Sequence, residues 1–236
     1  MTYYYHSYTH IGGRSNNEDA YIVLEHKKQK LFVVADGLGG HDAGAEASGI
    51  VTEILQKDFE NLGRKFQLEE SIAKANQIVI ANQKEIGKKM RTTVTAVYIN
   101  DGRITCANVG DSRTYLFSKG EIVYQSTDHS VAQMAVYSGE IKKEAIRSCE
   151  DRNILTRAIG AREELKVDVC TMKVREFDSV LLCSDGFWEY VLEEEMQEDL
   201  KTSRSPEEWV NKMLKRHNNR KPDDCDNNTV IAMMKR

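Results

Sequence analysis

Short apolar runs separated by polar turns predict a chain rich in antiparallel strands. The strand-like residues 20–25 and 31–35 flank the polar turn HKKQK, which indicates a hairpin. The aromatic start of the chain, Tyr3 to Tyr5, is expected to form an edge strand. Further β-branched, aromatic or aliphatic runs predict strands at 92–99, 103–109, 113–117, 121–125, 167–174, 179–184 and 229–234.

Three other segments carry helical signals. Apolar residues recur at helical spacing from Ala43 to Phe59 and from Leu68 to Ile86. Ser205-Pro206 is typical of a helix start, because serine caps free N–H groups and proline fits the first turn. Residues 128–154 are polar and irregular, which predicts a surface excursion. This order of elements favours an α+β layered domain over an alternating parallel α/β fold.

Composition narrows the class of protein. The 236 residues include only two prolines and no repeat or linker, so we expect one domain over 1–236. The net charge of −4 argues against a general nucleic-acid binder, and the basic run at 215–221 is interpreted as a solvated helix end. No apolar run approaches the roughly 18 residues that cross a bilayer, and the start lacks a secretion signal. Five cysteines without a CxxC pair indicate free thiols in a reducing cytoplasm.

Carboxylates recur where apolar strands end. A single Asp-Gly pair is usually only a turn, but the same placement at several strand ends is harder to explain in that way. Strands that pack together bring their ends together, so these acids would repel one another unless divalent cations lay between them. The motifs offer only hard oxygen ligands, which favours Mg²⁺ or Mn²⁺ over Zn²⁺. The acids concerned are Glu18, Asp19, Asp36, Asp111, Asp185 and Asp226.

Two neighbours of these acids have candidate roles of their own. Gly37, directly after Asp36, has no side chain, so its carbonyl oxygen can approach a metal ion. Arg14 stands four residues before Glu18 and can either pair with an acid or grip an anionic substrate with its planar guanidinium. The sequence leaves both roles of Arg14 open.

Eight motifs extend over nearly the whole chain. They are RSNNED (14–19), ADGLGGH (35–41), TTVTAV (92–97), NVGDSR (108–113), TDHSV (127–131), LTRAIG (155–160), LLCSDG (181–186) and DNNTV (226–230). In their order and spacing the chain resembles the metal-dependent serine/threonine protein phosphatases of type 2C, the PPM family, in their short bacterial form. One such motif would be weak evidence, whereas eight in order are strong.

The resemblance implies a fold and a metal centre. The fold would be a four-layer α/β/β/α sandwich around a central antiparallel β-sandwich, with a flap at about 128–154 beside the active site. Asp36 would bridge two metal ions, with Glu18 and the Gly37 carbonyl on one ion and Asp185 and Asp226 on the other.

Further residues are implied around that centre. Arg14 would bind the phosphate. Asp19 would not bind a metal ion itself but would hold a metal-bound water molecule. Asp111 would belong to a third, weaker metal site, with Glu189 as a further candidate ligand.

The implied activity is hydrolysis of phosphoserine and phosphothreonine in proteins by water activated between two Mn²⁺ or Mg²⁺ ions. The partners would be phosphorylated proteins, among them a eukaryotic-type serine/threonine kinase that the phosphatase opposes. No nucleic acid or membrane partner is expected, and the chain is expected to be a cytoplasmic monomer.

Three positions depart from the family's pattern. Leu38 stands where animal members carry a histidine suggested as a general acid, and the nearby His41 is more often a solvated turn residue than a substitute. Glu189 stands where the family usually has an aspartate, so a third metal site would be altered. Arg91 stands where a glycine normally precedes the paired threonines. None of these changes touches the two-metal core.

Two other functions compete with this interpretation. A pseudophosphatase that binds phosphoproteins without turnover should have lost a ligand of the two-metal core, and all of its acids are present. A phosphatase acting on a partner-switch regulator of the anti-sigma kind usually carries sensor domains, which these 236 residues do not contain. A free-standing form of that second type stays open.

Overall fold

The structure, a computed structural model, describes residues 2–39 and 43–235. Its strands coincide with the β-branched and aromatic runs of the sequence, because such side chains pack well on a pleated surface. They are β1 (Tyr3–His10), β2 (Asp19–His26), β3 (Gln29–Leu38), β4 (Arg91–Thr92), β5 (Val94–Asn100), β6 (Arg103–Val109), β7 (Arg113–Ser118), β8 (Glu121–Gln125), β9 (Asp168–Lys173), β10 (Ser179–Cys183) and β11 (Asn228–Lys235).

The helices include two long amphipathic ones, each with one apolar stripe to bury. Ser205 caps the last helix, and its hydroxyl accepts from the Glu208 amide at 3.1 Å, as the sequence predicts. The helices are α1 (Ala43–Leu62), α2 (Leu68–Ile86), α3 (Val131–Ser138), α4 (Asp185–Trp188), α5 (Glu193–Lys201) and α6 (Pro206–Arg220), with short 3₁₀ turns η1 (Gly63–Lys65), η2 (Lys143–Ser148) and η3 (Val174–Glu176).

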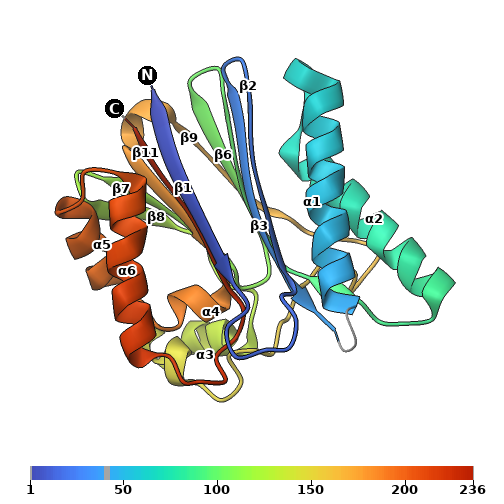
Figure 1. Ribbon diagram of the computed structural model, residues 1–236. Coiled ribbons are helices and arrows are strands. Elements are labelled where there is room, and N and C mark those ends of the chain that lie inside the picture. Colours follow the sequence, from blue (N-terminus) through green and yellow to red (C-terminus); the bar gives the residue numbers. More distant parts are fainter. Residues whose placement is uncertain (1, 40–42, 236) are drawn as a thin grey trace.

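Two sheets pack face to face between two layers of helices (Figure 1). One sheet has the order β1-β11-β10-β7-β8 and carries α5 and α6 on its outer face. The other has the order β2-β3-β5-β6-β9, with β4 beside β3, and carries α1 and α2. All pairings between the described strands are antiparallel. The expected four-layer sandwich is therefore confirmed, with the aromatic start as its edge strand β1.

Three apolar layers hold the sandwich together. In the central strand β3, Leu31, Val33 and Ala35 face α1 and α2, whereas Phe32 and Val34 face the other sheet. Both faces of β3 are therefore buried, which explains its unbroken apolar run. A third cluster, which includes Trp209, lies between the first sheet and α5 and α6.

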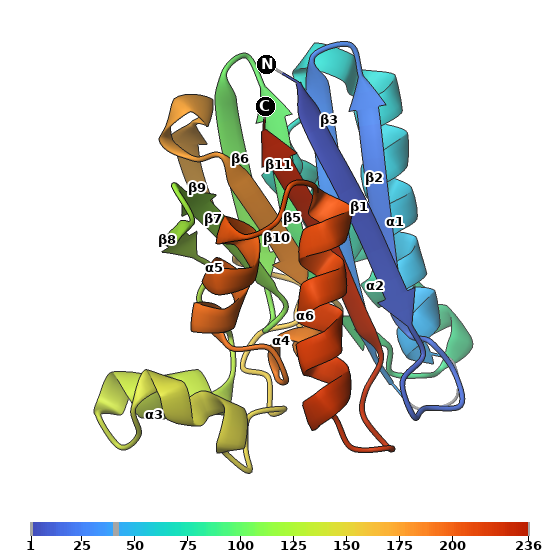
Figure 2. The same cartoon turned by 60° about the vertical axis from the view of Figure 1, so that its left-hand side comes forward.

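Some expectations were wrong in detail. Residues 128–154 are not irregular, since they contain α3 and η2, which project from the end of the sandwich (Figure 2). The basic run at 215–221 does end a helix, but it is not simply solvated. Arg216 and Arg220 pair with Glu195, and His217 is buried.

Two simpler features complete the fold. The five cysteines are free thiols, as expected. Among the helices that the structure describes, none combines the length and the apolar character that a membrane span requires.

Candidate active site

The strand-end acids gather at one end of the space between the two sheets. Phe32 and Val34 of β3 face the other sheet, so Asp36 continues on the same inner face. Asp19 of β2 pairs directly with Asp36 in the strand register. The alternation that builds the core therefore also brings carboxylates to its open edge.

The other sheet supplies two more acids. Asp185 begins α4 directly after β10, and Asp226 precedes β11, which is the neighbour of β10 in the sheet. Gly186 allows the two segments to meet, because a Cβ there would lie 2.1 Å from the carbonyl oxygen of Asn227.

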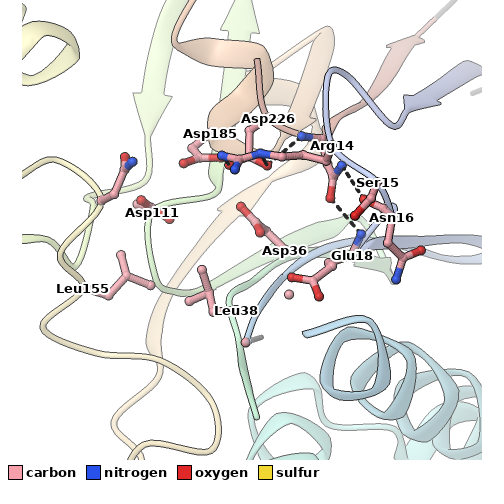
Figure 3. A pocket seen from close by; sticks show the side chains of 14 residues that line it. Arg14, Ser15, Asn16, Glu18, Asp36, Leu38, Asp111, Leu155, Asp185 and Asp226 are labelled. Carbon is pink, nitrogen blue, oxygen red and sulfur yellow. Dashed lines mark hydrogen bonds and ion pairs between the residues drawn. The ribbon is translucent and has the colours of Figure 1, made fainter. Parts of the chain in front are cut away.

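The acids open onto one pocket of about 410 Å³ (Figure 3). Two predicted residues are not part of its described lining: Asp19, which lies beside Asp36 in the neighbouring strand, and Glu189. The predicted residues that do line it are Arg14, Glu18, Asp36, Gly37, Asp111, Asp185 and Asp226.

Burial, together with the charges of neighbouring acids, raises the pKa of four of these acids. Burial, followed by the charge of Asp185, holds the pKa of Asp36 and that of Asp111 well above the usual value. Burial raises the pKa of Asp185 to about 6, with the charge of Asp226 as the next cause. Burial raises the pKa of Asp19 to about 7, although hydrogen bonds oppose the shift. Asp36, Asp111 and Asp185 nevertheless line the pocket, so a cation that enters it can reach them.

Glu18 lies against the first turn of α1. A Cβ on Gly44 would lie 2.5 Å from Oε2 of Glu18. The absence of a side chain at Gly44 therefore lets the Glu18 carboxylate pack directly against the helix backbone. The N-terminal end of a helix favours a negative charge. A Cβ on Gly37 would lie 2.2 Å from the carbonyl oxygen of Gly44. Both glycines are therefore required for the helix, Glu18 and the end of β3 to meet.

Arg14 supplies the positive charge of the described lining. Its Nη2 and Nε donate to the two carboxylate oxygens of Asp226, at 2.8 and 3.2 Å. The Arg14 side chain is 54% exposed, so it lies at the rim of the pocket. Of its two candidate roles, the structure shows the pairing with an acid, and the binding of an anionic substrate stays a prediction.

The donor set fits divalent metal ions. All acids of the lining offer hard oxygen ligands, and a cation would offset the burial and mutual repulsion that raise the pKa values of Asp36, Asp111 and Asp185. Oδ1 of Asp19 is buried and lacks a hydrogen-bond partner. In residues 2–39 and 43–235, no three His, Cys, Asp or Glu side chains already stand grouped as a finished metal site. The Asp36 and Asp185 side chains instead contact each other, and Arg14 pairs with Asp226, so metal ions would have to replace both contacts.

A buried network of hydrogen bonds and ring stacking connects Asp111 to the interior of the protein. Trp188 Nε1 donates to the carbonyl oxygen of Asp111 at 2.9 Å. The Arg113 guanidinium stacks 3.5 Å from the ring centroid of Trp188. The same guanidinium donates to both carboxylate oxygens of Asp128, at 2.8 and 2.6 Å. Asp111 is thereby tied to the start of the flap region.

The positions that depart from the family's pattern differ in their surroundings. The Glu189 carboxylate accepts from Arg152 of the flap at 2.6 Å. Leu38 lines the pocket, and Arg91 is exposed and pairs with Leu38 in the strand register. His41 lies outside the described residues.

Several lining residues were not singled out from the sequence. Asn227 belongs to the DNNTV motif, so its signal was present. It accepts from the Glu18 amide at 2.8 Å and donates to the carbonyl oxygen of Ile11 at 2.7 Å. Asn153 comes from the flap, whose path local patterns do not specify, and Leu155 directly follows it as the first residue of the LTRAIG motif. The remaining residues of this kind are Ser15 and Asn16.

Comparisons of sequence identify relatives over most of the chain. The family described as protein phosphatase 2C matches residues 7–229. The serine/threonine phosphatase Stp of Listeria innocua is 34% identical over 230 residues, covering 93% of this chain and 90% of that protein. The serine/threonine protein phosphatase PstP of Mycobacterium tuberculosis is 33% identical over 192 residues, covering 79% of this chain and 36% of that protein.

Solved structures show the same similarity in three dimensions. The serine/threonine phosphatase Stp1 from Staphylococcus aureus has a TM-score of 0.89 and 27% identity, covering 100% of this chain and 96% of that chain. The catalytic domain of PstP in complex with two manganese ions has a TM-score of 0.82 and 28% identity, covering 98% and 97%. Sequence and fold comparisons thus agree with each other.

Proposed function

The chain belongs to the protein phosphatase 2C family and is a metal-dependent serine/threonine phosphatase, and we propose that it uses two divalent cations in the carboxylate pocket. The observation that carries the proposal is the convergence of strand-end acids from both sheets on one pocket beside a single arginine. No stabilising role explains this convergence, because like charges that are enclosed together destabilise the fold.

The acids divide into two ligand sets. Glu18, Asp36 and the Gly37 carbonyl would hold one ion, and Asp36, Asp185 and Asp226 would hold the other. This division is supported by the central position of Asp36, which contacts Asp185 of one sheet and, in the other sheet, lies opposite Asp19, the residue directly after Glu18. The manganese ions in the related PstP structure support Mn²⁺ as a suitable metal.

Bound cations would acidify a water molecule that attacks phosphorus and would offset the charge of the phosphoryl oxygens. Arg14, at the rim, would turn its guanidinium from Asp226 to the phosphate oxygens. Asp19, which accepts a hydrogen bond from the Ser184 hydroxyl at 2.8 Å, would keep its free oxygen for water behind Asp36. None of the described lining residues is a histidine, so water would supply the proton for the departing serine or threonine oxygen.

The proposal extends to a weaker third metal site at Asp111. Asp111 lines the pocket next to the flap segment, which supports this assignment. Glu189 joins the site only if its carboxylate leaves Arg152. For this reason we propose that the third site is weaker than the two-metal core.

The substrates would be phosphoserine and phosphothreonine in proteins, including a serine/threonine kinase that this phosphatase opposes in the cytoplasm. The names of the Stp and PstP relatives support the amino-acid specificity. The free cysteines support a reducing compartment.

Hydrolysis of a phosphothreonine peptide tests the proposal, with Mn²⁺, with Mg²⁺ and with excess EDTA. Turnover should require metal and should fall by orders of magnitude in Asp36→Asn, because the central ligand charge is lost. Asp101→Asn is the matched control, since Asp101 is exposed in a turn with a φ of 46° that asparagine also accepts. A folded chain that binds the peptide but shows no turnover with either metal would indicate the pseudophosphatase instead.

A further inference from the structure

Two leucines line a pocket that is otherwise built from charged and polar groups. Leu38 ends β3 and Leu155 directly follows the flap, and both are half-buried. Neither belongs to the three apolar clusters of the described residues. Core packing therefore does not account for an aliphatic side chain at either position.

Backbone pairing holds both leucines in place. Leu38 pairs with Arg91 of β4, next to the acids of β3. Leu155 forms an isolated bridge with Ser130, and the residues on either side of it are bonded to the start of the flap. The amide of Val131 donates to the carbonyl of Ile154, and the amide of Thr156 to that of His129, both at 2.8 Å. The backbone at Leu38 and at Leu155 is thus fixed by pairing, and the two side chains together are called the leucine wall of the pocket.

The wall lies on the far side of Asp36 from Arg14 in the view of Figure 3. The charged side of the pocket suits the phosphate, and the leucine side can gain free energy only by burying apolar atoms. The pocket volume of about 410 Å³ falls in the range of sites that enclose whole small molecules, so a phosphate group does not fill it.

We propose that Leu38 and Leu155 determine substrate specificity by receiving an apolar side chain next to the phosphorylated residue. The inference rests on the proposed phosphatase function and adds a sequence preference to it. The substrate class is a phosphoprotein whose phosphorylated serine or threonine has an aliphatic neighbour in sequence.

Phosphothreonine peptides with leucine or asparagine at one neighbouring position test this preference. Leucine and asparagine have similar size and no charge, so the acids of the pocket affect both peptides alike. One series varies the preceding residue and another the following residue, with glycine elsewhere. In one of the two series kcat/KM should be about three- to tenfold higher for leucine, as expected for partial burial of one aliphatic side chain.

Leu38→Asn and Leu155→Asn should each reduce that ratio towards one, while the asparagine peptides are still hydrolysed. Ile154→Asn is the matched control, because Ile154 is 53% exposed beside Leu155 and does not line the pocket. Thermal unfolding verifies that each variant is folded.

Three results separate the outcomes. A wild-type ratio within about twofold in both series overturns the proposal. If the variants alter only the ratio of phosphothreonine to phosphoserine turnover, the leucines contact the phosphorylated residue itself, and the proposal is also wrong. Absence of turnover with every peptide in Mn²⁺ and Mg²⁺ would instead refute the phosphatase function on which the inference rests.

Discussion

The buried pair of Arg113 and Asp128 offers a sharp test of the electrostatic reasoning. Their side chains are 3% and 2% exposed, and Arg113 donates to both oxygens of Asp128. Arg113→Met leaves a buried carboxylate without its cation, and Asp128→Leu leaves a buried guanidinium without its main anion. Each change should lower the free energy of unfolding by about 3 to 5 kcal/mol.

The structure ranks the two substitutions. After Asp128→Leu, Arg113 keeps Glu193 at 3.2 Å and its stacking on Trp188, so the cost should lie near about 3 kcal/mol. After Arg113→Met, Asp128 loses the guanidinium that donates to both of its carboxylate oxygens, and the stacking on Trp188 is lost as well, so the cost should approach about 5 kcal/mol. Either loss is a large share of the roughly 5 to 15 kcal/mol that stabilises a typical domain.

Urea unfolding in excess EDTA measures these losses without a contribution from metal binding. The double variant Arg113→Met with Asp128→Leu should be more stable than Arg113→Met alone, because no unpaired charge remains. Lys84→Gln serves as the control, since Lys84 and Glu163 are 70% and 80% exposed, and its effect should stay within about 0.5 kcal/mol. Single losses below about 1 kcal/mol, or additive losses in the double variant, would refute the reasoning.

Three further predictions concern the site. Arg14→Lys keeps the charge but loses the planar fork, so KM should rise several-fold with a smaller change in kcat; an unchanged KM in peptide kinetics would assign Arg14 to Asp226 alone. Without metal, the folded chain binds more protons than the unfolded chain between pH about 4 and about 7, because the pKa of Asp19 is raised to about 7 and that of Asp185 to about 6. Stability in EDTA should therefore fall as pH rises through this window, and urea titrations of Asp19→Asn should show a shallower fall. Gly37→Ala should destabilise the chain and weaken Mn²⁺ binding, because the new Cβ meets a backbone oxygen at 2.2 Å, whereas Gly49→Ala in α1, with nothing within 4 Å, should raise the melting temperature.

The long elements could be predicted from the sequence because each follows one dominant rule. β3 and β5 are unbroken apolar runs, and α1 and α2 have clear stripes. The short helices were missed for an equally physical reason. α5 reads EEEMQEDLK, and its acids are held by arginines of α6, so its stability comes from tertiary contacts rather than from its own pattern.

The convergence of the acids was also predictable, because strands of one sandwich end at shared edges. The contacts between those acids and loops were not. The pairing of Arg14 with Asp226 depends on how the loop after β1 turns. The pairing of Glu189 with Arg152, and the place of Leu155 in the pocket, depend on the path of the flap.

The space between the sheets explains how the fold tolerates such a pocket. The residues between the sheets are apolar around Phe32 and Val34. Nearer the carboxylates they are replaced by side chains with hydroxyl groups. Thr95 bonds to Thr114, and Thr93 bonds to Ser112, each at 2.7 Å across from one sheet to the other. These buried hydroxyls hold the sheets together where apolar packing ends, and they supply hydrogen bonds to the polar groups beyond. The Thr93 hydroxyl, for example, accepts from the amide of Asp36 at 3.0 Å. The backbone that carries the central carboxylate is thus fixed by this hydroxyl layer, so the destabilising charges are confined to the last residues of each strand.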